Sequence, residues 1–214
     1  RGAPDVQVLF DITLAFAERS FNSIVGESGS GKSTLMNIIG TLDVPTSGDV
    51  EIAGQSVASL SRDRLAELRN RTIGFVFQFH YLLPEFTALE NVLMPYSIGP
   101  QGAKREVLQW ADELFDFMGV SRVKNNPAGK MSGGQQQRVA IIRSLINKPR
   151  VILADEPTGN LDSVNSAATY ERFRDINQRY GTTFIIVTHD RRIAEQTDRI
   201  VEIRDGRLLM DIRK

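Results

Sequence analysis

One glycine-rich stretch constrains the fold and the chemistry of this chain more than any other feature of its sequence. It follows the pattern Gly-x-x-x-x-Gly-Lys-Ser/Thr and comes directly after the largely apolar residues 23–25. Glycine reaches backbone conformations that are closed to residues with a Cβ, so successive N–H groups can point at one anion. The pattern therefore predicts a phosphate-binding loop that consists of Gly26, Glu27, Ser28, Gly29, Ser30, Gly31, Lys32 and Ser33, followed by Thr34.

Two side chains of this loop have specific chemical tasks. Lys32 places a positive charge near the β- and γ-phosphates of a nucleotide, and the hydroxyl of Ser33 can bind Mg²⁺. Residues 34–39 are expected to form a helix, whose N-terminus carries partial positive charge toward the phosphates. A glycine-rich turn that fits the pattern by chance is the alternative, but an expected strand before the loop and a helix after it argue against that reading. The chain is therefore predicted to bind a nucleoside triphosphate.

The composition is that of an ordinary globular protein. Of 214 residues, 41% are apolar and 24% are charged, so the chain can bury the core of one large domain or of a domain with an insertion. The 26 basic and 26 acidic residues cancel, which argues against a broad nucleic-acid-binding surface. The absence of cysteine excludes disulfides and thiol catalysis. No apolar run approaches the roughly 20 residues that cross a bilayer, and no signal peptide is visible, so we expect a soluble chain.

The order of the expected elements indicates the fold class. Strands are expected at residues 6–10, 12–16, 21–25, 50–54, 73–77, 151–154 and 183–187, and a hairpin at 199–203 and 207–210. The main helices after the loop helix are expected at residues 61–70, 103–118, 134–147 and 163–179. Strands therefore alternate with helices on both sides of a mostly helical middle. This order predicts an α/β protein with a mainly parallel core, formed by residues 1–78 and 148–214, and an inserted helical subdomain at 79–147.

Two further stretches have predicted chemistry. Asp155 and Glu156 follow the apolar strand at 151–154; Asp155 is placed to reach a Mg²⁺ ion, and Glu156 to polarise the water that attacks the γ-phosphate. An acidic pair that caps a surface strand is the alternative, and the phosphate loop upstream disfavours it. A second candidate anion site begins an expected helix and consists of Ser132, Gly133, Gly134 and Gln135. By itself, this stretch would more simply be a loop with a helix cap.

These stretches together resemble the nucleotide-binding subunit of ATP-binding-cassette (ABC) transporters, and the resemblance covers essentially the whole chain. It implies a P-loop NTPase core of the RecA type with an antiparallel β part, and ATP with Mg²⁺ as the bound groups. Residues 26–33 look like the Walker A loop of this family, and 151–155 look like Walker B, with Glu156 as the catalytic carboxylate. Residues 132–135 look like the signature motif, although Met131 stands where leucine is usual.

Three more positions acquire roles through this resemblance. Gln78 looks like the glutamine that contacts Mg²⁺ and the attacking water, Asp162 belongs to a stretch that resembles the D-loop, and His189 looks like the switch histidine at the γ-phosphate. The simpler readings are a polar strand end for Gln78, a helix cap for 160–162 and a structural histidine for His189. The position of His189 after a buried strand favours the functional reading. The other histidine, His80, lacks such a context and is expected at a surface or an interface.

The aromatic residue on which adenine stacks in this family is not evident. Tyrosine and tryptophan are absent from residues 1–20, and Phe10 and Phe16 fall in expected strands. We expect the stacking residue to lie upstream of Arg1, and the nucleotide affinity of this chain to be weaker as a result.

The resemblance also implies partners. One chain carries one copy of each anion site, so two chains are expected to form a head-to-tail homodimer that encloses two equivalent ATP sites. Residues 77–92 resemble the branch of the family that contains lipoprotein-releasing ATPases and, more loosely, MacB-like exporters. The apolar residues of the loop 79–86 would be costly to expose unless something docks on them, and the expected partner is a cytoplasmic helix of a membrane permease. The alternative, that these residues pack internally, stays open.

The expected function is that of an ATPase subunit, peripheral at the cytoplasmic face of the bacterial inner membrane, that powers a permease. Lipoprotein release is the expected task, with peptide or antibiotic export and cell-division signalling as alternatives. A soluble ABC ATPase that acts on DNA or ribosomes is a rival class, but it usually carries coiled-coil insertions or two cassettes, and this chain has neither. A scaffold that binds ATP and hydrolyses little is disfavoured by Glu156 and His189.

Overall fold

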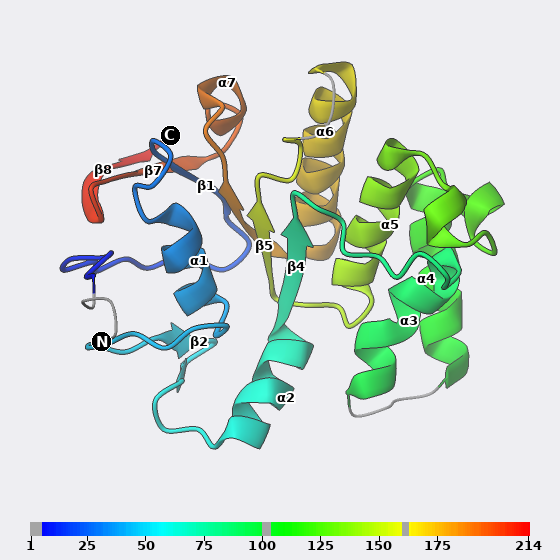
Figure 1. Ribbon diagram of the computed structural model, residues 1–214, viewed down its shortest axis with the longest axis horizontal. Coiled ribbons are helices and arrows are strands. Elements are labelled where there is room, and N and C mark those ends of the chain that lie inside the picture. Colours follow the sequence, from blue (N-terminus) through cyan, green and yellow to red (C-terminus); the bar gives the residue numbers. More distant parts are fainter. Residues whose placement is uncertain (1–5, 100–103, 160–162) are drawn as a thin grey trace, which may run out of the picture.

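The computed structural model describes residues 6–99, 104–159 and 163–214, and these are built around one mixed sheet of six strands (Figure 1). The strands are ordered β4-β5-β6-β1-β7-β8 across the sheet. The first five in this order are parallel, and β8 is antiparallel to β7. Their bounds are Phe21–Val25 for β1, Ile73–Phe77 for β4, Val151–Asp155 for β5, Thr183–Val187 for β6, Arg199–Arg204 for β7 and Arg207–Arg213 for β8.

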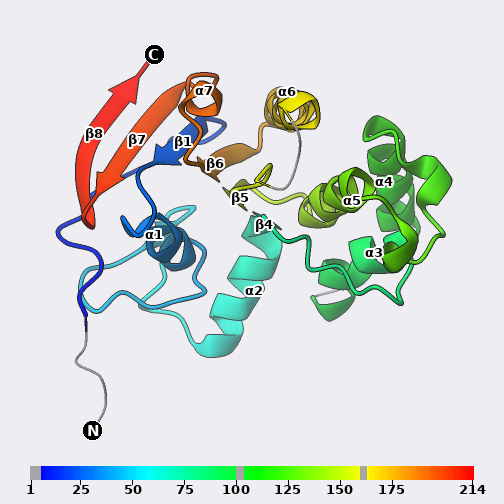
Figure 2. The same ribbon diagram turned by 45° about the horizontal axis from the view of Figure 1, so that its top comes forward.

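Helices cover both faces of this sheet and extend beyond one edge of it. Figure 2 shows α1 and α2 on one face and α6 and α7 on the other. Helices α3, α4 and α5 lie together beyond the β4 edge, and α5 packs directly against β4. The bounds are α1 Lys32–Ile39, α2 Arg62–Thr72, α3 Ala88–Ile98, α4 Lys104–Phe117, α5 Gly133–Leu145, α6 Ser163–Tyr180 and α7 Arg191–Ala194, with 3₁₀ turns η1 at Ser121–Val123 and η2 at Ala128–Lys130.

Alternation along the central strands divides the core into two layers. In β5, Ile152 and Ala154 belong to the cluster that contains the apolar side chains of α4, α5 and α6. Leu153 lies between them and belongs to the opposite cluster, which contains α1. Successive side chains of a strand point to opposite faces, so a strand that is covered on both faces must be apolar at nearly every position. This requirement explains the continuous apolar runs from which β5 and β6 were predicted.

Helices α2, α3 and α5 each begin at a polar residue whose side chain accepts a hydrogen bond from the first turn. Ser61 caps α2, as its sequence position predicts. Thr87 and Ser132 start α3 and α5 with full capping boxes, in which Glu90 and Gln135 reach back to the cap. The bounds of α3 were not predicted, although the pair Thr87 and Glu90 is a sequence signal for its start.

The prediction of strands at 6–10 and 12–16 is wrong. Within the described residues neither segment joins a ladder, and the chain runs there as an extended segment along the core. The alternation is real in burial at 12–16, where every second residue is partly covered, but not at 6–10. The residues that pack against the core are Leu9, Ile12, Leu14 and Phe16. A period of two reports one buried face, but it does not supply a neighbouring strand edge for backbone hydrogen bonds.

The predicted strand at 50–54 turns back on itself instead of running straight. Ala53 and Gly54 have positive φ angles of 53° and 79°, and they join β2 (Glu51–Ile52) to β3 (Gln55–Ser56). Two consecutive positive φ angles are typical of the tight turns that connect antiparallel strands. Alanine in this position hides the turn from a reading of the sequence, because it rarely adopts positive φ.

The other predicted elements are present within a few residues of their expected bounds. The hairpin of β7 and β8 turns at Asp205 and Gly206, with φ angles of 48° and 72°. No helix in the described part of the chain is both long enough and apolar enough to cross a membrane.

Candidate active site

Most of the predicted site residues gather at one edge of the sheet, because each follows the carboxyl end of a parallel strand. Gly26 follows β1, Gln78 follows β4 and Glu156 follows β5 directly, while His189 lies two residues beyond β6. These four strands are neighbours in the sheet, so their carboxyl ends form a continuous edge. Ligands of open α/β sheets bind in the crevice at this edge. The fold thus assembles one site from four distant parts of the sequence.

The phosphate-binding loop has glycine where the backbone geometry requires it. A Cβ on Gly26 would lie 2.2 Å from the backbone oxygen of Ile203 in β7, so a larger residue would force the backbone apart. Gly31 has a φ angle of 101° and forms the N-cap of α1. No side-chain hydrogen bond caps this helix, which leaves its first backbone N–H groups for an anionic ligand.

Lys32 begins α1 and is only 8% exposed. Its ammonium group donates to the carbonyl oxygens of Gly26 (2.9 Å) and Glu27 (2.7 Å), which hold it over the loop. An ammonium has three N–H donors, so it can also bind a phosphate oxygen. The hydroxyl of Ser30 in the same loop is buried and has no hydrogen-bond partner among the described residues. Buried polar groups are almost always paired, so this hydroxyl indicates a polar ligand in the loop.

The residues at the end of β5 fit a Mg²⁺ ion. Asp155 accepts a hydrogen bond from the hydroxyl of Ser33 across the site (3.3 Å). Burial raises the pKa of Asp155, and the hydrogen bond from Ser33 acts in the opposite direction. A carboxylate and a hydroxyl are the hard oxygen ligands that Mg²⁺ prefers. Within the described residues, no group of three or more His, Cys, Asp or Glu side chains is placed to hold a metal ion.

Glu156 and His189 form a pair in direct contact. The carboxylate oxygen Oε1 of Glu156 lies 2.8 Å from Nδ1 of His189 and accepts a hydrogen bond from the His189 backbone N–H at 2.9 Å. The backbone of Glu156 has a φ angle of 43°, a left-handed conformation that is uncommon outside glycine. Two backbone hydrogen bonds fix this conformation. The N–H of Glu156 donates to the carbonyl oxygen of Val187 (2.9 Å), and the carbonyl oxygen of Glu156 accepts from the N–H of Gly159 (3.0 Å). The carboxylate is thereby aimed at the edge of the sheet.

Gln78 lies against the loop that follows Glu156. A Cβ on Gly159 would lie 2.8 Å from Nε2 of Gln78, so glycine permits this close approach. The structure therefore brings the predicted Q-loop glutamine to the same edge as the two carboxylates. Asp162 and the rest of the stretch 160–162 lie outside the described residues. The predicted role of Asp162 stays a prediction.

The predicted signature motif lies apart from the phosphate loop. Ser132, Gly133, Gly134 and Gln135 begin α5, where Ser132 and Gln135 form the capping box described above. Helix α5 packs against β4, α3 and α4, whereas α1 packs against β5 and β6. One chain therefore does not bring its two candidate anion sites together.

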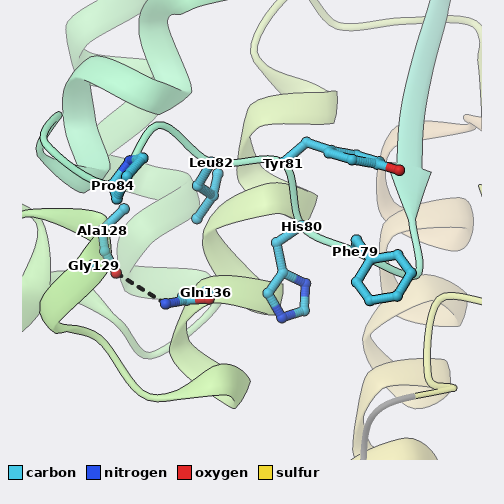
Figure 3. Close-up of a pocket in the computed structure, with 8 residues that line it drawn as sticks. All are labelled: Phe79, His80, Tyr81, Leu82, Pro84, Ala128, Gly129 and Gln136. Atoms are coloured by element: carbon cyan, nitrogen blue, oxygen red, sulfur yellow. Dashed lines mark hydrogen bonds between the residues drawn. The ribbon is translucent and has the colours of Figure 1, made fainter.

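A cleft of about 380 Å³ lies beside the loop that follows β4 (Figure 3). Phe79 and Tyr81 at this cleft are 62% and 66% exposed, although the ring of Tyr81 lies edge-on to that of Phe77, with 5.5 Å between the ring centroids. His80 is half-buried between them, and burial is the main cause that lowers the pKa of its imidazole. The cleft is lined by Phe79, His80, Tyr81, Leu82, Pro84, Ala128, Gly129 and Gln136.

Arg143 of α5 fixes this loop and was missed at the level of the sequence. Its guanidinium donates to the backbone oxygens of His80 and Tyr81, both at 2.7 Å. Burial lowers the pKa of Arg143. A single cation inside the run 139–145, in which Ser144 is the only other polar residue, was the signal that could have identified it.

The fold and the geometry at this edge define a P-loop nucleoside triphosphatase. A model of the family described as ABC transporter matches residues 9–159. The ATP-binding protein LolD of the lipoprotein-releasing system of Anaeromyxobacter dehalogenans (strain 2CP-C) is 50% identical over 204 residues, 95% of this chain and 85% of that protein. The chain belongs to the ABC transporter family, and it is an ATP-binding cassette that hydrolyses ATP.

Solved structures agree with this assignment. The dimeric structure of MJ0796, a bacterial ABC transporter cassette, has a TM-score of 0.88 and 42% identity, and it covers 96% of this chain and 90% of its own. A dimeric post-hydrolysis state of MJ0796 bound to ADP and Pi has a TM-score of 0.90 and 40% identity, with 100% of this chain and 93% of that chain covered. The predicted family, α/β P-loop fold and ATPase activity are confirmed.

Proposed function

We propose that this chain is the ATPase subunit of a lipoprotein-releasing ABC transporter and acts at the cytoplasmic face of the inner membrane. The observation that carries the proposal is the 50% identity to LolD along 95% of the chain. The exposed aromatic loop beside the site supports it, because a cassette that powers a membrane protein needs a surface on which that protein docks.

The contacts at the sheet edge support specific roles in ATP hydrolysis. Lys32 and the N–H groups of the phosphate loop bind the β- and γ-phosphates, with the neighbouring Thr34 also in contact. Glu156 polarises the attacking water and receives its proton, and His189 holds the carboxylate through their direct contact. Gln78 orients the same water from the end of the neighbouring strand β4. The attacking oxygen then lies in line with the leaving oxygen of ADP.

Ser33, Gln78 and Asp155 are the residues that would hold Mg²⁺ with the nucleotide. When bound, the ion would neutralise charge on the β- and γ-phosphate oxygens. The hydrogen bond between Ser33 and Asp155 supports this assignment, because it already places two oxygen ligands side by side.

We further propose that two chains enclose two ATP molecules head to tail. In this arrangement the phosphate loop of one chain faces Ser132, Gly133, Gly134 and Gln135 of the other, with Asp162 at the same interface. The separation of these motifs within one chain supports the proposal, as do the dimeric forms of the related cassette MJ0796. Residues 79–147 would then move as a helical subdomain that closes the signature motif over the nucleotide.

The permease is proposed to dock at residues 79–86. Phe79 and Tyr81 project beside the cleft, and Leu83 and Phe86 are 42% and 43% exposed, so the loop presents an apolar surface to a partner helix. Arg143 holds the backbone of this loop against α5, whose first residues form the signature motif. A helix that presses on the loop would therefore also push on α5.

Co-purification from native membranes in mild detergent, followed by mass spectrometry, tests this function. We expect membrane subunits with few spanning helices and large extracytoplasmic domains to accompany the parent chain. A Phe79→Ser, Tyr81→Ser double variant should lose them, whereas a variant at exposed residues far from the loop, Leu209→Ser with Met210→Ser, should retain them. Ribosomal or DNA-bound partners without a membrane protein would contradict the proposal.

A further inference from the structure

Gln137 on α5 makes a buried hydrogen bond to the loop that carries Glu156. Its side-chain nitrogen Nε2 donates to the carbonyl oxygen of Pro157 at 2.6 Å. Gln137 is only 1% exposed and Pro157 is buried as well, so solvent has little access to this bond. Pro157 comes directly after Glu156 in the chain. The contact therefore joins α5 to the backbone next to the proposed catalytic carboxylate, and none of the roles above uses it.

The other half of the same amide is unpaired. The side-chain oxygen Oε1 of Gln137 is buried and has no hydrogen-bond partner among the described residues. A buried polar atom without a partner is destabilising, so a glutamine is an unfavourable choice if the position serves packing alone. An apolar side chain of similar length would fill the space without this cost. The amide thus indicates a specific use for its N–H group, which holds Pro157.

The loop after β5 needs such a contact because its backbone conformation is unusual. A proline pushes the residue before it toward an extended backbone, yet Glu156 has a left-handed φ angle of 43°. Val187 and Gly159 hold the N–H and the carbonyl of Glu156, as described above. Pro157 has no N–H group, so its carbonyl is the only backbone group by which a neighbour can hold it. Gln137 occupies that carbonyl.

We propose that Gln137 is a positioning residue, which couples the position of α5 to the orientation of the Glu156 carboxylate. The inference rests on the catalytic role proposed above for Glu156. Helix α5 also carries Arg143, which holds the backbone of the loop at 79–86. A displacement of α5 would therefore pull on the Pro157 carbonyl and turn the peptide group that follows Glu156. The rate of hydrolysis depends on this orientation, because a catalytic group must be aligned with the water that it polarises.

The substitution Gln137→Met removes the donor and keeps an unbranched side chain of similar length. We expect kcat for ATP to fall by about two- to tenfold, the range that one neutral hydrogen bond supports. KM for ATP should stay unchanged, because the phosphate loop is untouched. Gln137→Leu also lacks the donor and should show the same fall in kcat without a change in KM, so the test does not depend on the folding of one variant.

The matched control is Asn177→Leu, which removes another buried amide that binds backbone carbonyls. Asn177 on α6 is 6% exposed, and its Nδ2 donates to the carbonyl oxygens of Arg19 (2.9 Å) and Thr182 (2.8 Å). These two residues precede β1 and β6, so the contact lies at the amino ends of the strands, opposite the site. The control should melt at a lower temperature than the parent but keep the parental kcat.

A second experiment determines whether Gln137 acts through Glu156. Single-turnover hydrolysis is measured for Glu156→Gln and for the double variant Glu156→Gln, Gln137→Met. The double variant should be no slower than Glu156→Gln, because the carboxylate that Gln137 orients is already absent. Losses from two independent effects would multiply instead.

The outcomes separate this inference from the function on which it rests. A lower kcat with unchanged KM in both Gln137 variants, and no further loss in the double variant, support the positioning role. Parental kcat in the Gln137 variants, an equal fall in Asn177→Leu, or losses that multiply would overturn it. Parental turnover by Glu156→Gln alone would instead overturn the catalytic assignment of Glu156.

Discussion

At the scale of single residues, Glu156 carries the clearest mark of function. Its φ angle of 43° places a non-glycine residue in a left-handed conformation, which costs of order 1–3 kcal/mol unless the surroundings impose it. The hydrogen bonds to Val187, Gly159 and His189 impose it here. Strain of this kind clusters at active sites, where it orients a reacting group before the substrate arrives.

Lys32 is the residue on which nucleotide binding depends most. Its ammonium is almost buried at the start of α1, so its charge acts on the phosphates with little screening by solvent. The variant Lys32→Ala should bind ATP at least about 100-fold more weakly than the parent, because charge-assisted hydrogen bonds to phosphate are lost. Titration calorimetry measures the affinity. Lys130→Ala, at an exposed position in η2, should bind like the parent, and an unchanged affinity in Lys32→Ala would overturn the phosphate-loop assignment.

At the scale of elements, the hairpin of β7 and β8 braces the phosphate loop. The N–H of Gly206 in its turn donates to the carbonyl of Ser30 (3.0 Å), and the carbonyl of Gly206 accepts from Phe10 (2.8 Å). A Cβ on Gly206 would lie 2.0 Å from the backbone oxygen of Val8. The turn therefore holds the loop on one side and the N-terminal segment on the other.

One ion pair fastens this hairpin. Arg199 in β7, with 7% of its side chain exposed, donates to both carboxylate oxygens of Asp211 in β8, at 2.6 and 2.7 Å. Its guanidinium also lies 5.1 Å from the ring centroid of Phe16. The variant Asp211→Asn should lower the free energy of unfolding by about 1–3 kcal/mol, because it leaves a buried cation poorly paired. Urea denaturation measures this difference.

The control pair and the pH dependence make this prediction specific. Asp11 is 93% exposed and pairs with Arg207 at 3.4 Å, so Asp11→Asn should change stability by less than about 0.5 kcal/mol. Hydrogen bonding to Arg199 holds the pKa of Asp211 below its ordinary value of 3.8. The stabilisation is thus present above that value and is lost as the pH falls through the lower pKa of the folded state. A difference between parent and Asp211→Asn that persists at the lowest pH would contradict this account.

The elements differ in how well the sequence predicts them. The central strands and the amphipathic α4 are determined by burial on known faces, and α2 by its cap at Ser61, so local patterns suffice. The segment at 12–16 alternates in the same way, yet its backbone finds no strand to pair with in the described structure. Pairing depends on distant segments, which a local period does not contain.

The residues of the site also divide into those that the local sequence predicts and those that depend on the fold. Gly26, Lys32 and Glu156 are predictable because phosphate chemistry demands these residue types at these spacings. Arg143 is not, since its importance lies in the backbone carbonyls that the fold brings beside it. Phe10 and Phe16, considered for adenine stacking, each lie under an arginine guanidinium instead.

At the scale of the whole molecule, the account requires two chains. The phosphate loop and the signature motif belong to different helices, which pack on different strands of the sheet (Figure 1). An ATP molecule bound by both motifs would therefore join two copies of the chain, and its hydrolysis would release them. ATP binding then shifts the equilibrium between separate chains and the closed pair. The size of the shift is set by the difference between the affinity of ATP for the closed pair and its affinity for the separate chains.

Light scattering on the Glu156→Gln variant tests this account most directly. Amidation removes the carboxylate that polarises the water, so the variant should bind ATP but hydrolyse it about 10²- to 10⁴-fold more slowly than the parent. With saturating Mg-ATP we predict the mass of two chains, and without nucleotide the mass of one. The same variant with Lys32→Ala should stay a monomer in both conditions. A single-chain mass for Glu156→Gln while calorimetry confirms bound ATP would contradict the account.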